Sequence, residues 1–166
     1  MWTEAFLEYL TLERNYSLRT VEEYRDDLNA FESYYKKVDS TLSWETMDGD
    51  VVRDWMVSMM EAGRTATTVN RRLSALRTFY RYLLRRDWIK VDPVRNIQGP
   101  KKKKPLPVFL KESEMNRLLD GDFFGNDFLG KRDKLIVNTF YVTGIRLSEL
   151  TSLNNQDVDM WGGVIR

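Results

Sequence analysis

The sequence predicts a mainly α-helical protein, in which a four-helix bundle precedes the start of a second unit that holds both helix and strand. Three observations support this fold class. Apolar residues recur at helical spacing through the first half of the chain, a stretch rich in proline and lysine at 99–107 interrupts the pattern, and a further apolar helical segment lies at 133–142. The 166 residues suffice for two small domains with cores of their own.

The first two helices are expected near the amino terminus. Residues 2–14 carry apolar side chains at helical spacing. A second helix is expected to begin near Thr20, because Thr20 and Glu23 fit a capping box in which each side chain accepts from the other residue's backbone amide. The apolar stripe that follows reaches Tyr35.

A loop rich in Ser, Thr and Asp at 39–49 separates this helix from a third, which is expected over 50–62. Gly63 suits the left-handed conformation that follows many helices. The fourth and longest helix is expected over 65–87. Helices joined by such short connections form one bundle, so we expect a single helical domain over 1–98.

Cysteine and histidine are both absent from the sequence. Disulfides, cysteine zinc sites and Ser-His-Asp triads are therefore excluded within this chain. No apolar run approaches the roughly 20 residues of a membrane-spanning helix, and no signal peptide opens the chain. We therefore expect a soluble protein of the cytoplasm.

Positive charge is concentrated in the middle of the chain, although the net charge is only +1. Residues 63–104 hold 13 basic and two acidic residues, a net charge of +11, between flanks of −8 and −2. Such asymmetry favours a polyanionic partner such as nucleic acid. A solvated helix followed by a charged linker is the alternative.

The fourth helix has a polar side next to its apolar side. On a helical wheel this side, which we name the basic strip, consists of Asn70, Arg71, Ser74, Arg77, Arg81 and Arg85. Guanidinium groups bind phosphates and guanine edges, and Asn and Ser side chains add hydrogen bonds. No acidic residue lies between Arg64 and Arg86 to form the usual pairs along a helix, so we expect the strip to contact double-stranded DNA. A solvated helix face is the alternative.

An interdomain linker is expected over 99–107. Its prolines bar a helix, and its four successive lysines repel one another into an extended form. The lysines are Lys101, Lys102, Lys103 and Lys104. They either lie along the DNA backbone, where each neutralised phosphate steepens the salt dependence of binding, or only keep the linker soluble.

The second unit mixes helix with a short strand. Helices are expected at 111–119, 133–142 and 146–153. A loop is expected at 122–130, and Gly144 ends the second of these helices. Residues 161–166 read as a turn that feeds a strand, with no partner strand earlier in the chain. We therefore expect an unfinished domain that exposes apolar side chains over 135–153.

Two segments resemble the tyrosine recombinases, the phage-integrase and Xer class. Residues 143–150, Thr-Gly-Ile-Arg-Leu-Ser-Glu-Leu, resemble the motif around the first catalytic arginine of that family. Residues 68–83 are similar to the last long helix of the family's N-terminal core-binding domain, and 92–107 are similar to its interdomain passage. The resemblance covers almost the whole chain and is nearest to the bacterial Xer recombinases.

The resemblance implies a fold and an activity. The fold is a SAM-like core-binding domain over 1–98, followed after the linker by the first part of an α+β catalytic domain over 108–166. Members of the family cut and rejoin DNA at inverted-repeat sites through a 3′-phosphotyrosyl intermediate. Four protomers, identical or of two kinds, assemble on two sites, and the reaction needs no metal or nucleotide cofactor.

The same resemblance implies roles for two residues. Arg146 would grip the scissile phosphate, and Glu149 would hold its guanidinium; an ordinary surface ion pair is the alternative. The family's catalytic lysine, His-x-x-Arg box and nucleophilic tyrosine have no counterpart in this sequence. We therefore expect this chain to bind DNA but not to catalyse. A stand-alone DNA-binding module without chemistry and a helical protein-interaction domain are the competing interpretations.

Overall fold

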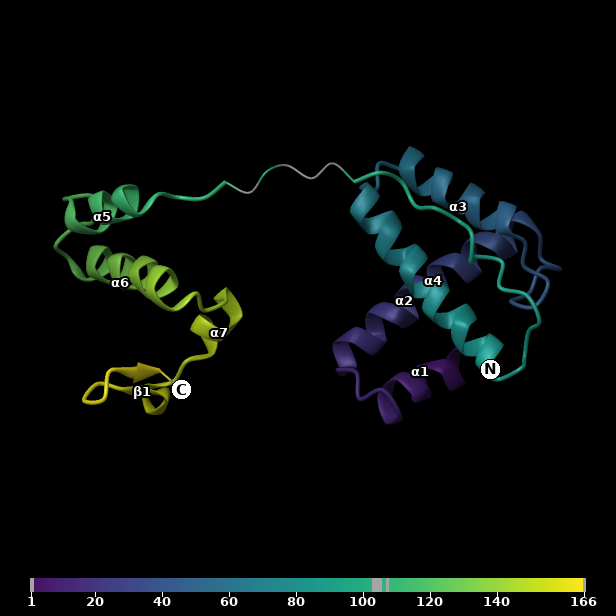
Figure 1. Cartoon of the computed structure of the whole chain (residues 1–166), viewed down its shortest axis with the longest axis horizontal. Helices are drawn as coiled ribbons and strands as arrows, with labels where there is room; N and C mark the ends of the chain where they lie inside the picture. Colours follow the sequence, from purple (N-terminus) through teal and green to yellow (C-terminus); the bar gives the residue numbers. More distant parts are fainter. Residues whose placement is uncertain (1, 103–105, 107, 166) are drawn as a thin grey trace. The chain divides into compact units, whose positions relative to one another are not determined.

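The computed structural model describes residues 2–102, 106 and 108–165. Two compact units make up the chain, Met1–Lys104 and Pro105–Arg166 (Figure 1). The division between them lies inside the stretch predicted as a linker. Lys103 and Lys104, two of the predicted DNA contacts, lie outside the described residues.

Four helices form the first unit, as the sequence predicts. Their bounds are Trp2–Leu12 for α1, Leu18–Val38 for α2, Gly49–Glu61 for α3 and Ala66–Arg85 for α4. Helix α2 contacts each of the other three, and α4 also contacts α3 (Figure 1). Gly63 follows α3 with a φ of +77°, which confirms the expected left-handed end of that helix.

The start of α2 differs from the prediction. The N-cap is Ser17 rather than Thr20, and the helix begins at Leu18. The Ser17 hydroxyl accepts a hydrogen bond from the Thr20 backbone amide at 3.2 Å. Because Ser17 and Thr20 both carry hydroxyls three residues apart, either could cap a helix, and the earlier one does.

Aromatic side chains dominate the core of the first unit. Phe6 of α1, Phe31 of α2 and Phe79 of α4 are fully buried. Trp44, from the loop between α2 and α3, packs against two of them, with ring centroids 4.8 Å from Phe79 and 5.8 Å from Phe31. The Tyr80 hydroxyl donates a hydrogen bond to the Trp44 carbonyl at 3.2 Å. A loop with a polar sequence therefore supplies a core residue.

The chain after α4 runs back along that helix. Ile89, Val94 and Ile97 are buried in the same core. The Arg77 guanidinium donates to the Ile97 carbonyl, and the Asn70 amide donates to the Pro100 carbonyl at 2.8 Å. The first unit therefore includes the start of the predicted linker.

The second unit contains three helices and a small sheet among its described residues. Their bounds are Glu112–Asp120 for α5, Phe128–Thr143 for α6, Leu147–Ser152 for α7, Asn155–Asp157 for a 3₁₀ turn, Val158–Asp159 for β1 and Val164–Ile165 for β2. Helix α6 begins before the predicted 133, because Asp127 caps it by accepting from the Gly130 amide at 2.9 Å. Gly144 ends α6 in the left-handed conformation, as predicted.

The short sheet corrects one expectation. β2 has a partner: it pairs antiparallel with β1, and Val158 lies opposite Ile165. The Asp159 carboxylate accepts from the amides of Trp161 and Gly162 at 3.0 and 2.8 Å and so closes the turn between the strands. Each strand has only two residues, too few to produce an alternating pattern in the sequence.

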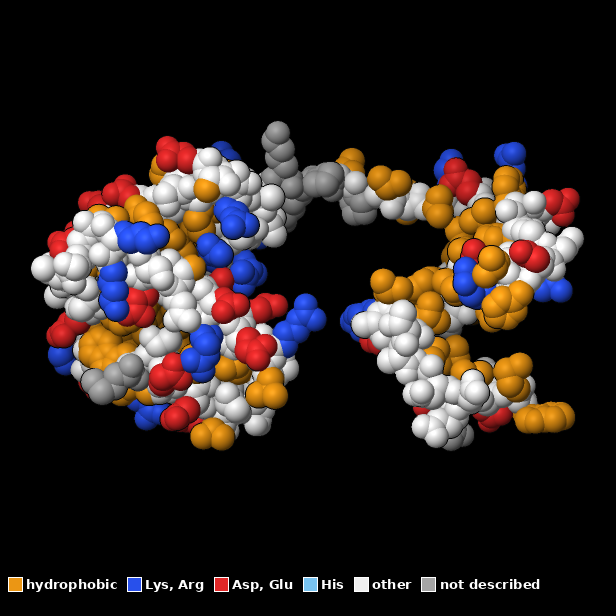
Figure 2. Space-filling model, turned by 180° about the vertical axis from the view of Figure 1, so that it is seen from behind, with side chains coloured by type: hydrophobic (Ala, Val, Ile, Leu, Met, Phe, Trp, Pro, Cys, Tyr) orange, Lys and Arg blue, Asp and Glu red, His pale blue; other side chains and the backbone are white. Residues whose placement is uncertain are grey.

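Apolar side chains are exposed over the second unit, as expected (Figure 2). Among its described residues, Met115 is the one buried hydrophobic side chain. Leu135 and Val142 of α6 are 65% and 72% exposed, and no α6 side chain is buried. In the described part of the chain, no helix has the length and apolar character needed to cross a membrane.

This difference in burial predicts a difference in backbone protection. We expect amides in α6 to exchange with deuterium far faster than amides in α4, because eight α4 side chains are buried and none in α6 is. Hydrogen exchange followed by mass spectrometry compares the two helices in one sample. A monodisperse monomer in which both helices are equally protected would contradict the prediction.

Candidate nucleic-acid interface

The apolar side of α4 fixes the orientation of the basic strip. Thr65 caps the helix, its hydroxyl accepting from the Thr68 amide at 3.3 Å. The side chains that α4 buries are Val69, Leu73, Ala75, Leu76, Phe79, Tyr80, Tyr82 and Leu83. The strip lies outside this set: Arg71, Ser74, Arg81 and Arg85 are exposed, and Asn70 and Arg77 are half-buried.

Arg71 has acidic partners that the sequence analysis missed. Its guanidinium makes two hydrogen bonds to the buried carboxylate of Asp27 on α2, at 2.7 and 2.9 Å. Glu23, one helical turn earlier on α2, lies 3.9 Å from the same guanidinium. The counter-charge therefore comes from a neighbouring helix, while the prediction considered acidic residues on α4 alone. Arg71 is a structural residue as well as a candidate DNA contact.

Asp27 also faces a second arginine. The Nε of Arg72 lies 3.4 Å from the Asp27 carboxylate, and the Arg72 guanidinium lies 6.0 Å from the ring centroid of Trp55. Burial raises the pKa of the Asp27 carboxyl above its ordinary value, and the charges of Arg71 and Arg72 oppose that rise. Asp27, Arg71 and Arg72 together fix α2 against α4 beside the first half of the basic strip.

The other strip residues divide into two groups. Asn70 and Arg77 hold the returning chain at Pro100 and Ile97, and Ser74 donates to the Asn70 carbonyl at 2.9 Å. In the second half of α4, Arg81 forms no hydrogen bond or ion pair with any described residue. Arg85 donates to the Tyr9 hydroxyl at 3.3 Å and pairs with no described carboxylate. This half of the strip leaves its guanidinium donors available.

Arg146 and Glu149 meet in the second unit as the spacing predicts. Arg146 is the N-cap of α7, and its guanidinium donates to the Glu149 carboxylate at 2.8 Å. The backbone amide of Arg146 donates to the other oxygen of the same carboxylate, also at 2.8 Å. These two hydrogen bonds lower the pKa of Glu149 below its ordinary value, and the backbone hydrogen bond has the larger effect. The Arg146 side chain is 81% exposed and can reach an anion.

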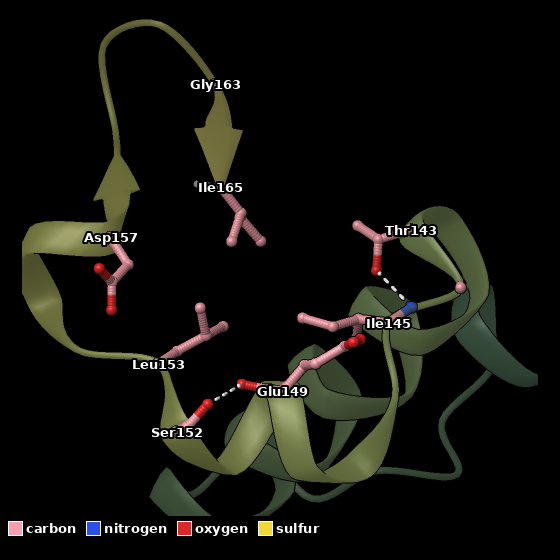
Figure 3. Close-up of a pocket in the computed structure, with 9 residues that line it drawn as sticks. Thr143, Ile145, Glu149, Ser152, Leu153, Asp157, Gly163 and Ile165 are labelled. Carbon is pink, nitrogen blue, oxygen red and sulfur yellow. Dashed lines mark hydrogen bonds between the residues drawn. The ribbon is translucent and has the colours of Figure 1, made fainter. Parts of the chain in front are cut away.

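A hollow of about 650 Å³ lies beside this pair. In Figure 3, Ile145, Leu153 and Ile165 point into it from three segments of the second unit. The hydroxyl of Ser152 donates to the Glu149 carbonyl at 2.9 Å. This hollow was not predicted from the sequence, because its walls come from the end of α6, from α7 and from β2, which only the fold brings together. No group of three or more metal-ligating side chains occurs in the described segments.

A model of a known protein family matches the first unit of the chain. The model for the phage integrase N-terminal SAM-like domain matches residues 3–87. The chain belongs to the phage integrase family. The match covers α2, α3 and α4 and all but the first residue of α1, and it includes the whole basic strip. This confirms the resemblance inferred from the sequence.

Curated relatives are Xer recombinases. The chain is 37% identical over 164 residues to tyrosine recombinase XerC of Halalkalibacterium halodurans, covering 99% of this chain and 54% of that protein. It is 32% identical over 163 residues to tyrosine recombinase XerD of Oceanobacillus iheyensis, covering 98% and 54%. The integrase-family chain thus spans about half the length of the curated relatives it matches. Residues 3–87 correspond to the N-terminal core-binding region of a tyrosine recombinase.

A solved structure shares the fold. The Tn1549 transposon integrase (residues 82–397), in complex with circular intermediate DNA, superposes with a TM-score of 0.69. The two chains are 18% identical, and the similarity covers 96% of this chain and 51% of that one. The predicted fold class, a mainly helical protein with a SAM-like domain followed by the start of an α+β unit, is confirmed.

The buried carboxylate on α2 predicts a large stability effect. We expect Asp27→Ala to lower the free energy of unfolding by about 3 kcal/mol, because the substitution breaks a buried ion pair. This value is the lower end of the range for such pairs, since Arg71 is half exposed. Asp26→Ala, next to it and exposed, is the control and should cost less than about 0.5 kcal/mol. Urea denaturation measures both, and equal midpoints for the two variants would refute the role of Asp27.

The Arg146–Glu149 pair predicts a titration. The pKa of Glu149 should lie below its ordinary value, so the pair persists above that value and breaks as pH falls through the folded-state pKa. Arg146→Gln should raise the pKa of Glu149 only in part, because the backbone amide still donates. Carboxyl ¹³C NMR follows the titration. A pKa of Glu149 that the substitution leaves unchanged would show that the guanidinium contributes nothing.

Proposed function

We propose that this chain is the DNA-binding part of a site-specific tyrosine recombinase, and that α4 presents the basic strip to the major groove of double-stranded DNA. One observation carries the proposal. Arg81 and Arg85 stand exposed on the second half of α4, and neither pairs with a carboxylate among the described residues. The opposite side of the helix is fixed in the core, so these guanidiniums have a defined direction.

The start of the linker supports the same surface. Asn70 holds Pro100 against α4, so the chain leaves the first unit beside the strip. Lys101 and Lys102 follow and are exposed. Together with Lys103 and Lys104 they add positive charge that suits a phosphate backbone. The Tn1549 integrase, which shares the fold, was solved in complex with DNA, and this favours the same partner here.

The second unit would contribute to strand cleavage in the whole protein. Arg146 would donate two hydrogen bonds to the scissile phosphate and stabilise its growing charge, while Glu149 holds the guanidinium in place. A tyrosine would attack the phosphorus, form a 3′-phosphotyrosyl bond and release a 5′-hydroxyl. This chain has no histidine and no counterpart of that tyrosine, so we expect it to bind DNA without cutting it.

The assembly follows from the same proposal. Four protomers would act on two inverted-repeat sites in the cytoplasm, with no metal or nucleotide cofactor. The Xer names of the curated relatives favour recombination as the overall reaction. The core-binding domain would give each protomer its grip on one half-site.

DNA binding is tested by fluorescence anisotropy with a labelled duplex of about 30 base pairs across a range of salt concentrations. We expect Arg81→Gln to weaken binding and to reduce the slope of log K against log salt by about 0.9 for each phosphate that is no longer neutralised. Arg81 is preferred to Arg77, because the guanidinium of Arg77 supports the returning chain.

The matched control is Arg53→Gln on α3. The Arg53 guanidinium pairs with Asp50, outside the strip, so its removal should leave duplex binding unchanged. No salt-dependent binding by the unaltered chain would overturn the proposed function. Equal losses of affinity from Arg53→Gln and Arg81→Gln would mean that net charge, rather than the strip, carries the affinity.

A further inference from the structure

A small polar cleft opens between the end of α1 and the second half of α4. Its volume is about 140 Å³, below the roughly 300–1,000 Å³ of pockets that take small organic molecules. The lining side chains are Tyr9, Leu10, Arg14, Tyr16, Thr78, Arg81, Tyr82 and Arg85. Three guanidiniums and three phenols therefore surround a space suited to a small ion, and no carboxylate lines it.

The loop after α1 brings Arg14 to this cleft. The backbone amides of Glu13 and Arg14 both donate to the Tyr9 carbonyl, at 3.0 and 3.1 Å. The Tyr16 amide donates to the Leu10 carbonyl at 3.0 Å. The loop is thus folded back over the end of α1, and it adds an arginine to the two that α4 supplies.

The charges of these three arginines are uncompensated within the part of the chain that the structure describes. Neither Arg14 nor Arg81 nor Arg85 pairs with a described carboxylate. Arg86, the residue after Arg85, differs from these three arginines. It pairs with Glu13 at 3.0 Å and lies over the Tyr82 ring. Like charges gathered without a counter-ion repel one another, and a bound anion would remove that repulsion.

The hydroxyl groups are also arranged for an anion. Tyr9 accepts a hydrogen bond from Arg85 at 3.3 Å, which leaves its own proton to donate. Tyr82 donates to the Ala5 carbonyl at 3.3 Å and Thr78 to the Ser74 carbonyl at 2.9 Å, so these two form walls rather than donors. The available donors are then the three guanidiniums and the hydroxyls of Tyr9 and Tyr16, a set that suits a tetrahedral oxyanion.

We infer that this cleft binds one phosphate group of the DNA backbone and thereby sets the register of the bundle on the duplex. The inference rests on the proposed function, and it adds Arg14, Tyr9 and Tyr16 to the interface. Contacts to phosphates position a protein on DNA, while contacts to base edges select the sequence. The cleft therefore acts on every duplex alike.

Arg14→Gln and Tyr16→Phe test the cleft, with Arg86→Gln as the matched control. Arg14 is an exposed loop residue, and circular dichroism checks that each variant folds. We expect Arg14→Gln to weaken binding equally to two duplexes of different sequence and to lower the salt slope by about one. Tyr16→Phe should weaken binding to both duplexes by a smaller factor, and Arg86→Gln should change neither quantity.

A second arm distinguishes a backbone phosphate from a free one. At fixed ionic strength, inorganic phosphate replaces chloride in the binding buffer. If the cleft takes a phosphate group, phosphate should inhibit duplex binding more than chloride does, and Arg14→Gln should abolish that difference. If Arg14→Gln abolishes the extra inhibition but leaves the salt slope unchanged, the ligand is free phosphate, which overturns the backbone assignment.

The outcomes separate this inference from the proposed function. If the unaltered chain binds no duplex, the proposed function fails and the backbone assignment with it. If it binds, and Arg14→Gln keeps both the affinity and the salt slope, only the cleft fails while the basic strip stands.

Discussion

The ion pair between Asp27 of α2 and Arg71 of α4 is the contact on which the arrangement of the first unit depends. A helix that carries many arginines and no acidic residue repels itself, and α4 also has to bury a wide apolar side. A carboxylate that is only 3% exposed supplies the missing charge from a different helix. Such a pair fixes geometry more than it adds stability, because the Asp27 carboxylate loses its hydration. The basic strip therefore has a fixed orientation relative to α2.

Distance along the chain decides which parts of the fold the sequence could predict. Helical periodicity follows from residues three and four apart, so the buried side of α4 and the turn at Gly144 were accessible from local patterns. The spacing of Arg146 and Glu149 within one turn was local too. Asp27 is 44 residues from Arg71, and no pattern within one helix reveals such a partner. Trp44 lies in a polar loop, and its burial depends on side chains of α2 and α4 that pack against its ring.

Function divides the basic strip in a way that the helical wheel does not show. A wheel treats every arginine on one side as equivalent, although Arg71 and Arg77 donate hydrogen bonds inside the protein and Arg81 donates none among the described residues. Arginines held by carboxylates or carbonyls still contribute charge to the surface, but their donors are partly used. The strip thus combines a half that maintains the fold with a half that is free to bind.

The proposed roles of Arg81 in the first unit and Arg146 in the second require different degrees of solvent exposure. In the first, Arg81 would need only to meet a phosphate or a base edge at a wet interface, where water-mediated contacts are normal. In the second, Arg146 would have to stabilise charge that grows on a phosphoryl group, and a guanidinium is far more effective there when water is displaced. The exposed apolar side chains of α6 and the hollow beside Glu149 are surfaces whose burial would displace that water. Under the proposed function, DNA binding by the first unit would therefore be efficient while Arg146 stays in solvent, and it would not depend on the exposed second unit.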